Sequence, residues 1–206
     1  RRQPARQSGQ RPASMTEPRV RTRPRSGRRV RGPIAAGIRD IADYPTPGIQ
    51  FKDITPLLAD GPLFAETVAV LASAHAPGSG AEVDVVAGIE ARGFIFGAPL
   101  ALALGVGFVP IRKSGKLPHT TVAAQYALEY GTASIEIHTD AVRPGQRVLL
   151  LDDVLATGGT AEAAAGLLED IGAEVVAVSF LIELGFLAGR SGCRAERCGP
   201  WSSIEI

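Results

Sequence analysis

Two adjacent carboxylates and a small-residue turn offer the clearest chemistry in this sequence. Asp152 and Asp153 follow the apolar run 148–151. The small residues that come next, before a helical pattern, are Ala156, Thr157, Gly158, Gly159 and Thr160. Adjacent carboxylates repel each other and need a polyol or a hydrated magnesium ion as partner, while exposed N–H groups at a helix start bind phosphate. The order suits a ribose 5-phosphate, although a plain tight connection with an N-cap at Thr160 would explain the second half alone.

Further candidate groups follow two other apolar runs. Glu90, Ala91 and Arg92 come after the run that begins at residue 83, and Arg112, Lys113 and Lys116 come after the run 107–111. Guanidinium and ammonium groups suit the oxygens of a diphosphate. A surface arginine in a tight turn and a solvated basic loop are the plainer alternatives. The polar stretch that continues to residue 130 is long enough to act as a lid.

The elements that must position these groups indicate an α/β domain. Apolar runs predict strands at 83–87, 107–111, 134–138, 148–151 and 175–181. Helical spacing predicts helices at 62–76, 93–104 and 160–171, and a short one at 38–41 that runs into a rigid turn. Such alternation is typical of a largely parallel sheet flanked by helices. Ligands bind beyond the carboxyl ends of the strands in these sheets, which is where the candidate groups lie.

Composition excludes several classes of protein. The chain has 206 residues, 45% of them hydrophobic, which is enough for one folded core and too much for a wholly disordered chain. No run of 18 uncharged apolar residues occurs, so we expect no membrane partner. The two cysteines, Cys193 and Cys198, cannot build a disulfide framework or a four-ligand zinc site. We expect a cytoplasmic protein.

The charge is distributed unevenly along the chain. Residues 1–34 contain eleven arginines and one acid, Glu17, and few large apolar residues. We therefore predict a disordered Arg-rich extension at 1–34 and one folded domain at 35–206. No apolar stretch follows the basic residues, as a signal peptide would require. A nucleic-acid-binding arm is the sharper interpretation and a dispensable extension the plainer one, which we favour.

The segment VLLLDDVLATGGT resembles the phosphoribosyl-diphosphate (PRPP) signature of type I phosphoribosyltransferases. Similarity to the adenine phosphoribosyltransferase family extends through IRDIADYPTPGIQFKDITPL, GIEARGFIFG, VPIRKSGKLP and YALEYG, and so over most of residues 35–185, whereas the tail 189–200 matches poorly. The resemblance implies a single-domain α/β fold with a small hood segment and a mobile lid loop. It also implies a homodimer that makes AMP and diphosphate from adenine and PRPP, in purine salvage.

The resemblance also implies roles for individual residues. Asp152 and Asp153 would hold the ribose hydroxyls, and residues 156–160 the 5-phosphate. Arg92 and the basic loop, with Arg112, Lys113 and Lys116, would hold the diphosphate, and Mg²⁺ would be carried by PRPP without direct protein ligands. The peptide between Glu90 and Ala91 is expected to be cis.

The lid and the base site complete the implied set. Glu129 would be the acid/base beside the purine, with a solvated acid at a strand end as the plainer alternative, and Tyr130 would lie in the closed loop. Phe51 would stack on adenine, and the main chain of Gln50 and Lys52 would read the edge of the base. A phosphoribosyltransferase for another purine stays open. So does a PRPP-binding nucleic-acid regulator that uses the basic arm, although the intact lid argues for catalysis and makes nucleic acid an unlikely partner.

Overall fold

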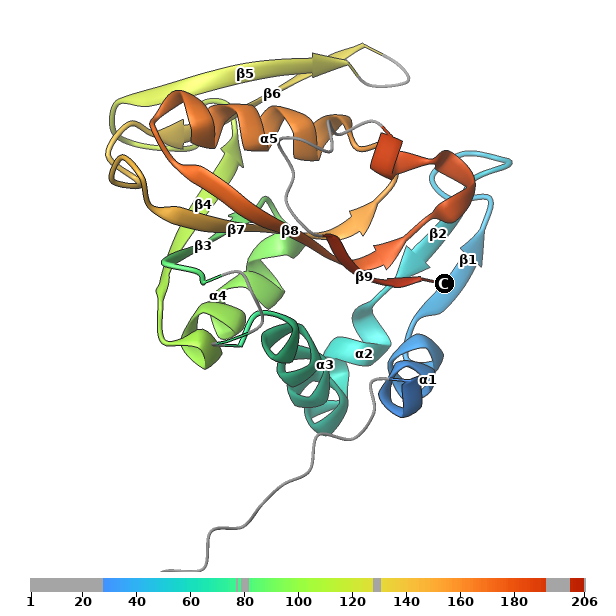
Figure 1. Cartoon of the computed structure of the whole chain (residues 1–206). Coiled ribbons are helices and arrows are strands. Elements are labelled where there is room, and N and C mark those ends of the chain that lie inside the picture. Colours follow the sequence, from blue (N-terminus) through green and yellow to red (C-terminus); the bar gives the residue numbers. More distant parts are fainter. Residues whose placement is uncertain (1–27, 77, 79–81, 128–130, 192–200, 206) are drawn as a thin grey trace, which may run out of the picture.

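The computed structural model describes residues 28–76, 78, 82–127, 131–191 and 201–205 (Figure 1). Its helices are α1 (Arg28–Ala36), α2 (Thr55–Ala59), α3 (Gly61–Ala74), α4 (Arg92–Leu104) and α5 (Gly159–Asp170). Its strands are β1 (Arg39–Ala42), β2 (Gln50–Asp53), β3 (Val85–Ile89), β4 (Gly107–Lys113), β5 (Thr121–Ala127), β6 (Thr132–His138), β7 (Arg147–Leu155), β8 (Glu174–Glu183) and β9 (Trp201–Glu205). Two short 3₁₀ turns, η1 (Gly185–Leu187) and η2 (Gly189–Ser191), follow β8.

A seven-stranded sheet organises the domain. Its strand order is β5-β6-β4-β3-β7-β8-β9. The five strands from β4 to β9 in this order pair in parallel, whereas β6 is antiparallel to both β4 and β5. A separate antiparallel hairpin, β1-β2, lies beside the carboxyl ends of β7 and β8 (Figure 1). The predicted α/β fold with a largely parallel sheet is confirmed.

Strand β7 has apolar packing on both faces, as its continuous apolar run predicts. Val148 and Leu150 belong to the core that α5 covers, and Leu149 and Leu151 to the core that α3 and α4 cover (Figure 1). All four side chains are completely buried. The helices also have the expected ends: Asp60 caps α3 by accepting the N–H of Leu63 at 3.0 Å, and Gly172, with φ of +90°, follows α5.

The start of the domain differs from the prediction in two places. Residues 38–41 do not form a helix: Arg39–Ala42 is strand β1, because it pairs with β2. Helix α1 begins at Arg28, inside the segment 1–34 that we expected to be disordered. Ile34 of α1 is fully buried in the core beneath α3 and α4, so the boundary at residue 35 is wrong. Residues 1–27 lie outside the described residues.

Two differences concern the segments that carry the site. The polar stretch after β4 is not one long loop, because β5 forms a hairpin with β6 and packs Val122, Ala124 and Tyr126 against the core under α5. Strand β7 runs past residue 151 to Leu155, so Asp152 and Asp153 lie within the strand rather than after it. No described helix is long and apolar enough to cross a membrane.

Candidate active site

The strand order brings together the three segments that carry the candidate groups. Strand β3 lies between β4 and β7, and all three run in parallel, so their carboxyl ends meet at one edge of the sheet. Glu90 and Arg92 follow β3, Arg112 lies near the end of β4, and the acidic pair lies near the end of β7. Residues that are 20 to 63 positions apart in the sequence thus become neighbours at the point where strand order changes direction.

Within the acidic pair Asp153 is buried and Asp152 is half-buried, and among the described residues the pair has one cationic partner. Asp153 is 4% exposed, and its Oδ2 forms an ion pair with Arg92 Nε at 2.7 Å that lacks hydrogen-bond geometry. Oδ1 of Asp152 accepts the N–H of Asp153 at 2.8 Å. Burial, reinforced by the charge of Asp153, raises the pKa of Asp152 well above its usual value, and burial also raises the pKa of Asp153. One guanidinium therefore does not compensate both carboxylates.

A glycine permits this close arrangement. A Cβ at Gly93 would lie 2.8 Å from the carbonyl oxygen of Leu151 and 3.2 Å from Oδ1 of Asp152. Gly93 is the second residue of α4, directly after Arg92. The loop after β3 can approach β7 only because no side chain stands between them.

Arg92 also connects the acidic pair to the hairpin β1-β2. Its guanidinium carbon lies 5.3 Å from the centre of the Phe51 ring, at the distance of a cation–π contact. Tyr44 packs edge-on against the same ring at 5.2 Å. Lys52 forms an ion pair with Asp40 at 2.6 Å, so its side chain is held on the hairpin.

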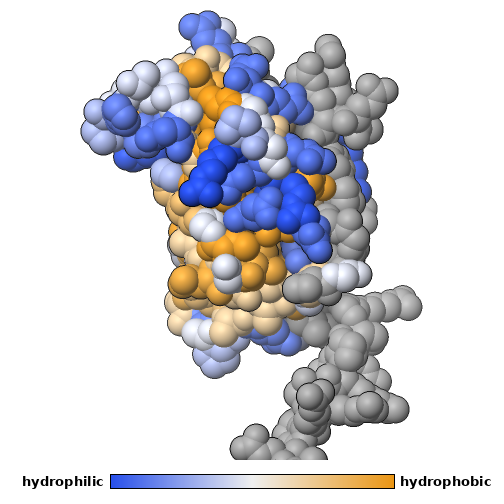
Figure 2. Space-filling model, turned by 60° about the vertical axis from the view of Figure 1, so that its left-hand side comes forward, coloured by the Kyte–Doolittle hydropathy of each residue, from blue (hydrophilic) through white to orange (hydrophobic). Residues whose placement is uncertain are grey.

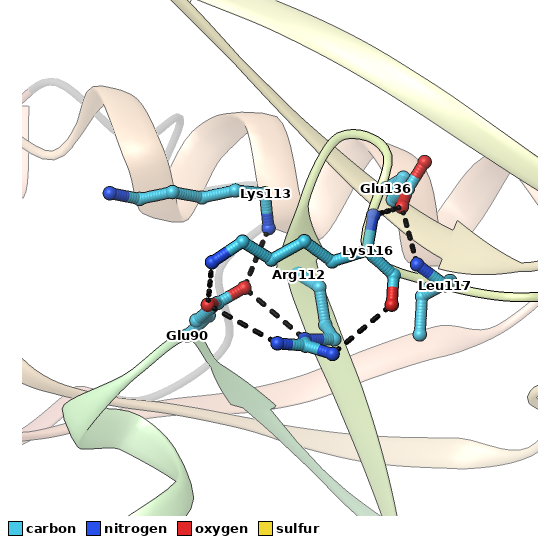
Figure 3. A network of polar contacts seen from close by, with 6 residues as sticks. All are labelled: Glu90, Arg112, Lys113, Lys116, Leu117 and Glu136. Carbon is cyan, nitrogen blue, oxygen red and sulfur yellow. Dashed lines mark hydrogen bonds and ion pairs between the residues drawn. The ribbon is translucent and has the colours of Figure 1, made fainter.

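A cluster of cations surrounds the carboxylate of Glu90 (Figure 3). Lys116 Nζ lies 2.8 Å from Oε1, and Arg112 Nε and the backbone N–H of Lys113 donate to Oε2 at 3.2 and 3.0 Å. Foremost the Lys116 contact, and with it these other donors, lowers the pKa of Glu90 to about 2. The side chain of Lys113 extends away from the cluster (Figure 3). The peptide bond between Glu90 and Ala91 is cis, as predicted.

A cavity of about 490 Å³ opens beside the end of β7. Its walls come from the β1-β2 hairpin, the end of β5, the β7-α5 connection and the segment after β8. The lining residues are Gly48, Ile49, Gln50, Tyr126, Ala156, Thr157, Thr160, Leu184, Phe186 and Leu187. A smaller cavity of about 60 Å³ shares Ala156, Thr157 and Thr160 with it and adds Asp152 and Gly158.

The start of α5 differs from the sequence-based interpretation in a way that matters for binding. The helix begins at Gly159, and its N-cap is Gly158, with φ of +86° and no side chain that caps the first turn. Thr160 is therefore not the N-cap. An end of this kind directs N–H groups and the positive end of the helix dipole at the small cavity.

The structure brings together most of the predicted site residues, but not all of them. Of the residues it describes, Gln50 lines the large cavity, whereas Phe51 and Lys52 do not. Glu129 and Tyr130 lie outside the described residues. The described residues contain no group of three or more His, Cys, Asp or Glu side chains placed to hold a metal ion.

Sequence reasoning missed Glu136, which is buried, and the wall formed by Leu184, Phe186 and Leu187. The wall follows β8, so the rule that ligands bind beyond strand ends was a signal that could have found it. Glu136 offered no such signal, because its strand alternates apolar and polar residues and so predicts a solvent-facing acid.

The largely parallel sheet, the uncapped start of α5 and the acidic pair on the preceding strand define a site whose chemistry suits a phosphorylated sugar at the strand ends. The phosphoribosyl transferase domain model matches residues 57–202. The chain belongs to the phosphoribosyltransferase family and, within it, to the adenine phosphoribosyltransferases. The family expected from the sequence is thereby confirmed.

Individual relatives show how close the similarity is. The adenine phosphoribosyltransferase of Acidothermus cellulolyticus is 61% identical over 158 residues, which is 77% of this chain and 88% of that protein. The crystal structure of the enzyme from Thermoanaerobacter pseudethanolicus is 50% identical, has a TM-score of 0.79, and matches over 85% of this chain and 98% of its own. The enzyme from Saccharomyces cerevisiae, solved with an imino-altritol bisphosphate and adenine, has the same TM-score at 36% identity, over 86% of this chain and 99% of its own.

Proposed function

We propose that this protein transfers the ribose 5-phosphate group of PRPP to adenine and releases AMP and diphosphate. The observation that carries the proposal is that two features near the end of β7 line one small cavity: the uncapped start of α5 and Asp152 of the acidic pair. The first suits a phosphate dianion and the second suits vicinal hydroxyls. The relatives named above, all adenine phosphoribosyltransferases, support the same reaction.

The chain's own residues bind and orient the sugar. N–H groups between Ala156 and Thr160 receive the 5-phosphate, and the carboxylates of Asp152 and Asp153 accept hydrogen bonds from the ribose hydroxyls. Hydroxyl donors lower the cost of keeping these carboxylates ionised, which their raised pKa values express. The substrate thus supplies the partners that one arginine does not.

The cationic groups stabilise the departing diphosphate. Arg92 follows β3 and pairs with Asp153, whereas Arg112 and Lys116, at the end of β4 and just after it, pair with Glu90. Lys113, the last residue of β4, adds a further charge. Fixed positive charge near the leaving group stabilises the transition state without reorganisation. A magnesium ion carried by PRPP, without direct protein ligands, would neutralise further charge on the diphosphate.

The base binds between the hairpin and the end of the lid. Phe51 stacks on adenine, and the backbone of Gln50 and Lys52 reads the edge of the base. Tyr126, three residues before Glu129, lines the large cavity, which supports Glu129 as the acid/base beside the purine and Tyr130 as part of the closed loop. A cytoplasmic location stays a prediction from the sequence.

A homodimer is part of the proposal. Helix α4 exposes apolar side chains on one side: Ile95 is 37% and Leu102 82% exposed, and Ala98 and Ala103 are exposed too. Figure 2 shows an apolar patch on the face of the molecule to which α4 belongs. A second copy of the chain would cover this side.

The test is AMP formation by the full chain from adenine, PRPP and Mg²⁺, with guanine, hypoxanthine and xanthine in parallel reactions. Turnover of adenine alone is expected. Turnover of another base would keep the PRPP site and reject the base assignment at Phe51. PRPP binding without turnover of any base would favour the regulator, which none of the relatives named above supports.

A further inference from the structure

Glu136 is a buried acid that the proposed reaction does not use directly. It lies on β6, is 6% exposed, and is opposite Arg112 of β4 and Ala123 of β5 in the strand register. Burial of a carboxylate is costly unless donors surround it. The donors around Glu136 therefore show which segment of the chain this carboxylate stabilises.

The backbone donors to Glu136 come from the turn between β4 and β5, residues 114–120. The backbone N–H groups of Lys116 and Leu117 both donate to Oε1 at 2.9 Å (Figure 3), and Thr121 Oγ1 lies 3.4 Å from Oε2. The Leu117 N–H is the largest cause of the lowered pKa of Glu136, which keeps the group ionised. The acid thus replaces a missing strand partner for two consecutive amides.

The same turn is held from its other side by a member of the cationic cluster. Nη1 of Arg112 donates to the carbonyl oxygen of Lys116 at 3.1 Å. The peptide groups on both sides of the Lys116 Cα are thereby fixed, because Glu136 accepts an N–H from each and Arg112 donates to the carbonyl oxygen of the second. From this anchored backbone the Lys116 side chain reaches Glu90 beside the cis peptide (Figure 3).

We propose that Glu136 is a positioning residue for the diphosphate site, because it fixes the turn from which Lys116 extends toward the loop after β3. The inference rests on the proposed function, which supplies diphosphate as the group that Lys116 and Arg112 meet. The turn is positioned by one carboxylate oxygen that lies within hydrogen-bond distance of two N–H groups. The negative charge of the carboxylate contributes less to this positioning than the location of the oxygen does.

Two substitutions separate reach from charge. Glu136→Gln keeps an acceptor oxygen at the same distance and loses the charge, whereas Glu136→Asp keeps the charge and withdraws the oxygens by about 1.5 Å, the length of one carbon–carbon bond. We expect Glu136→Gln to bind PRPP and diphosphate within about threefold of wild type, and Glu136→Asp to bind both at least about tenfold more weakly. Calorimetry with Mg²⁺ measures both affinities, and KM for adenine is expected to stay within about twofold in both variants.

The matched control is Asp60→Ala, which removes the cap of α3 far from the turn. We expect Asp60→Ala to lower the melting temperature and to leave PRPP affinity unchanged. The control thereby identifies any loss of PRPP affinity that is caused by lower stability alone. Normal PRPP affinity in Glu136→Asp, or a tenfold loss in the isosteric Glu136→Gln, would overturn the inference. Wild-type protein that binds neither PRPP nor diphosphate would overturn the proposed function as well. If wild-type protein binds PRPP but turns over no base, the affinities of the two variants still decide whether Glu136 positions the turn.

Discussion

The two ends of the central sheet shift the pKa values of their aspartates in opposite directions. At the amino end, Asp84 accepts the N–H, Nε and Nη2 of Arg147 at 2.9, 3.0 and 2.7 Å, and Glu82 pairs with the same guanidinium. These bonds, with the Arg147 side chain as largest cause, lower the pKa of Asp84 to about 2. At the carboxyl end, burial raises the pKa of both Asp152 and Asp153.

The difference shows which charged side chains the fold pairs with its own donors and which it leaves to pair with a ligand. The amino-end cluster contains a donor for each carboxylate, so it contributes to stability and needs no ligand. The carboxyl-end pair has Arg92 alone within ion-pair distance among the described residues. Like-charged carboxylates in a buried position cost free energy that a bound substrate can recover, which is typical of a functional site.

Replacement of the acidic pair should produce the largest effect on activity. In Asp152→Asn/Asp153→Asn we expect AMP formation to fall by at least about 10³-fold, because the ribose hydroxyls lose charged acceptors and Arg92 loses its partner. The melting temperature should not fall, because two costly charges are removed from a buried position. Initial rates and thermal unfolding of the same preparation measure both quantities.

Asp84→Asn is the matched control at the other end of the sheet, where the expected pattern is reversed: stability falls and activity is retained. Full activity in the double variant would reject the assignment of the acidic pair. A large drop in its melting temperature would show that the pair stabilises the fold as the amino-end cluster does, and the contrast between the two ends would disappear.

Replacement of Arg92 should have the next largest effect. Arg92→Ala removes the partner of Asp153 and the group beside the Phe51 ring, and we expect kcat/KM for PRPP to fall by about 10²-fold. Arg147→Ala is its counterpart at the amino end and should lower the melting temperature with little change in kcat/KM. Equal kinetic losses in both variants would mean that the two arginines act through stability alone.

The fold was predictable where apolar pattern and burial agree. Four consecutive apolar residues of β7 predicted a strand with a core on both faces, and Gly172 predicted the end of α5. Strand β5 was not predictable, because its inward residues Val122 and Ala124 are small and its pairing with β6 decides its structure. Residues 38–41 have apolar positions at helical spacing, yet the pairing with β2 overrides that preference.

The site was predictable to the extent that it follows the topology. From the sequence alone, the rule for parallel sheets places Glu90, Arg92, Arg112 and the acidic pair at one edge of the sheet. The role of Glu136 was not predictable, because its burial depends on β4 and β5 on either side and on a turn that folds back over it. Contacts of that kind are properties of the assembled sheet and have no local signature.

The smallest effect concerns the pH dependence of stability, where the two ends of the sheet should have opposite signs. The folded-state pKa of Asp84, about 2, is below its ordinary value of 3.8. Asp84 therefore contributes its full stabilisation above about pH 4, and this contribution is lost as the pH falls toward about 2. For Asp152 the folded-state pKa is raised, so the folded state retains the proton more tightly and ionisation opposes folding as the pH rises above about 4.

Thermal unfolding of wild type, Asp84→Asn and Asp152→Asn between about pH 3 and pH 7 tests these signs. The deficit of Asp84→Asn relative to wild type should shrink as the pH falls, because acid removes from wild type the same interaction that the substitution removes. The advantage of Asp152→Asn should grow as the pH rises, because only wild type then acquires the buried charge. If the melting temperatures of the two variants changed with pH in the same way relative to wild type, the expected difference in sign between the two ends of the sheet would be contradicted. Added PRPP should reduce the advantage of Asp152→Asn, since the ribose hydroxyls then give the ionised carboxylate in wild type the partners it otherwise lacks.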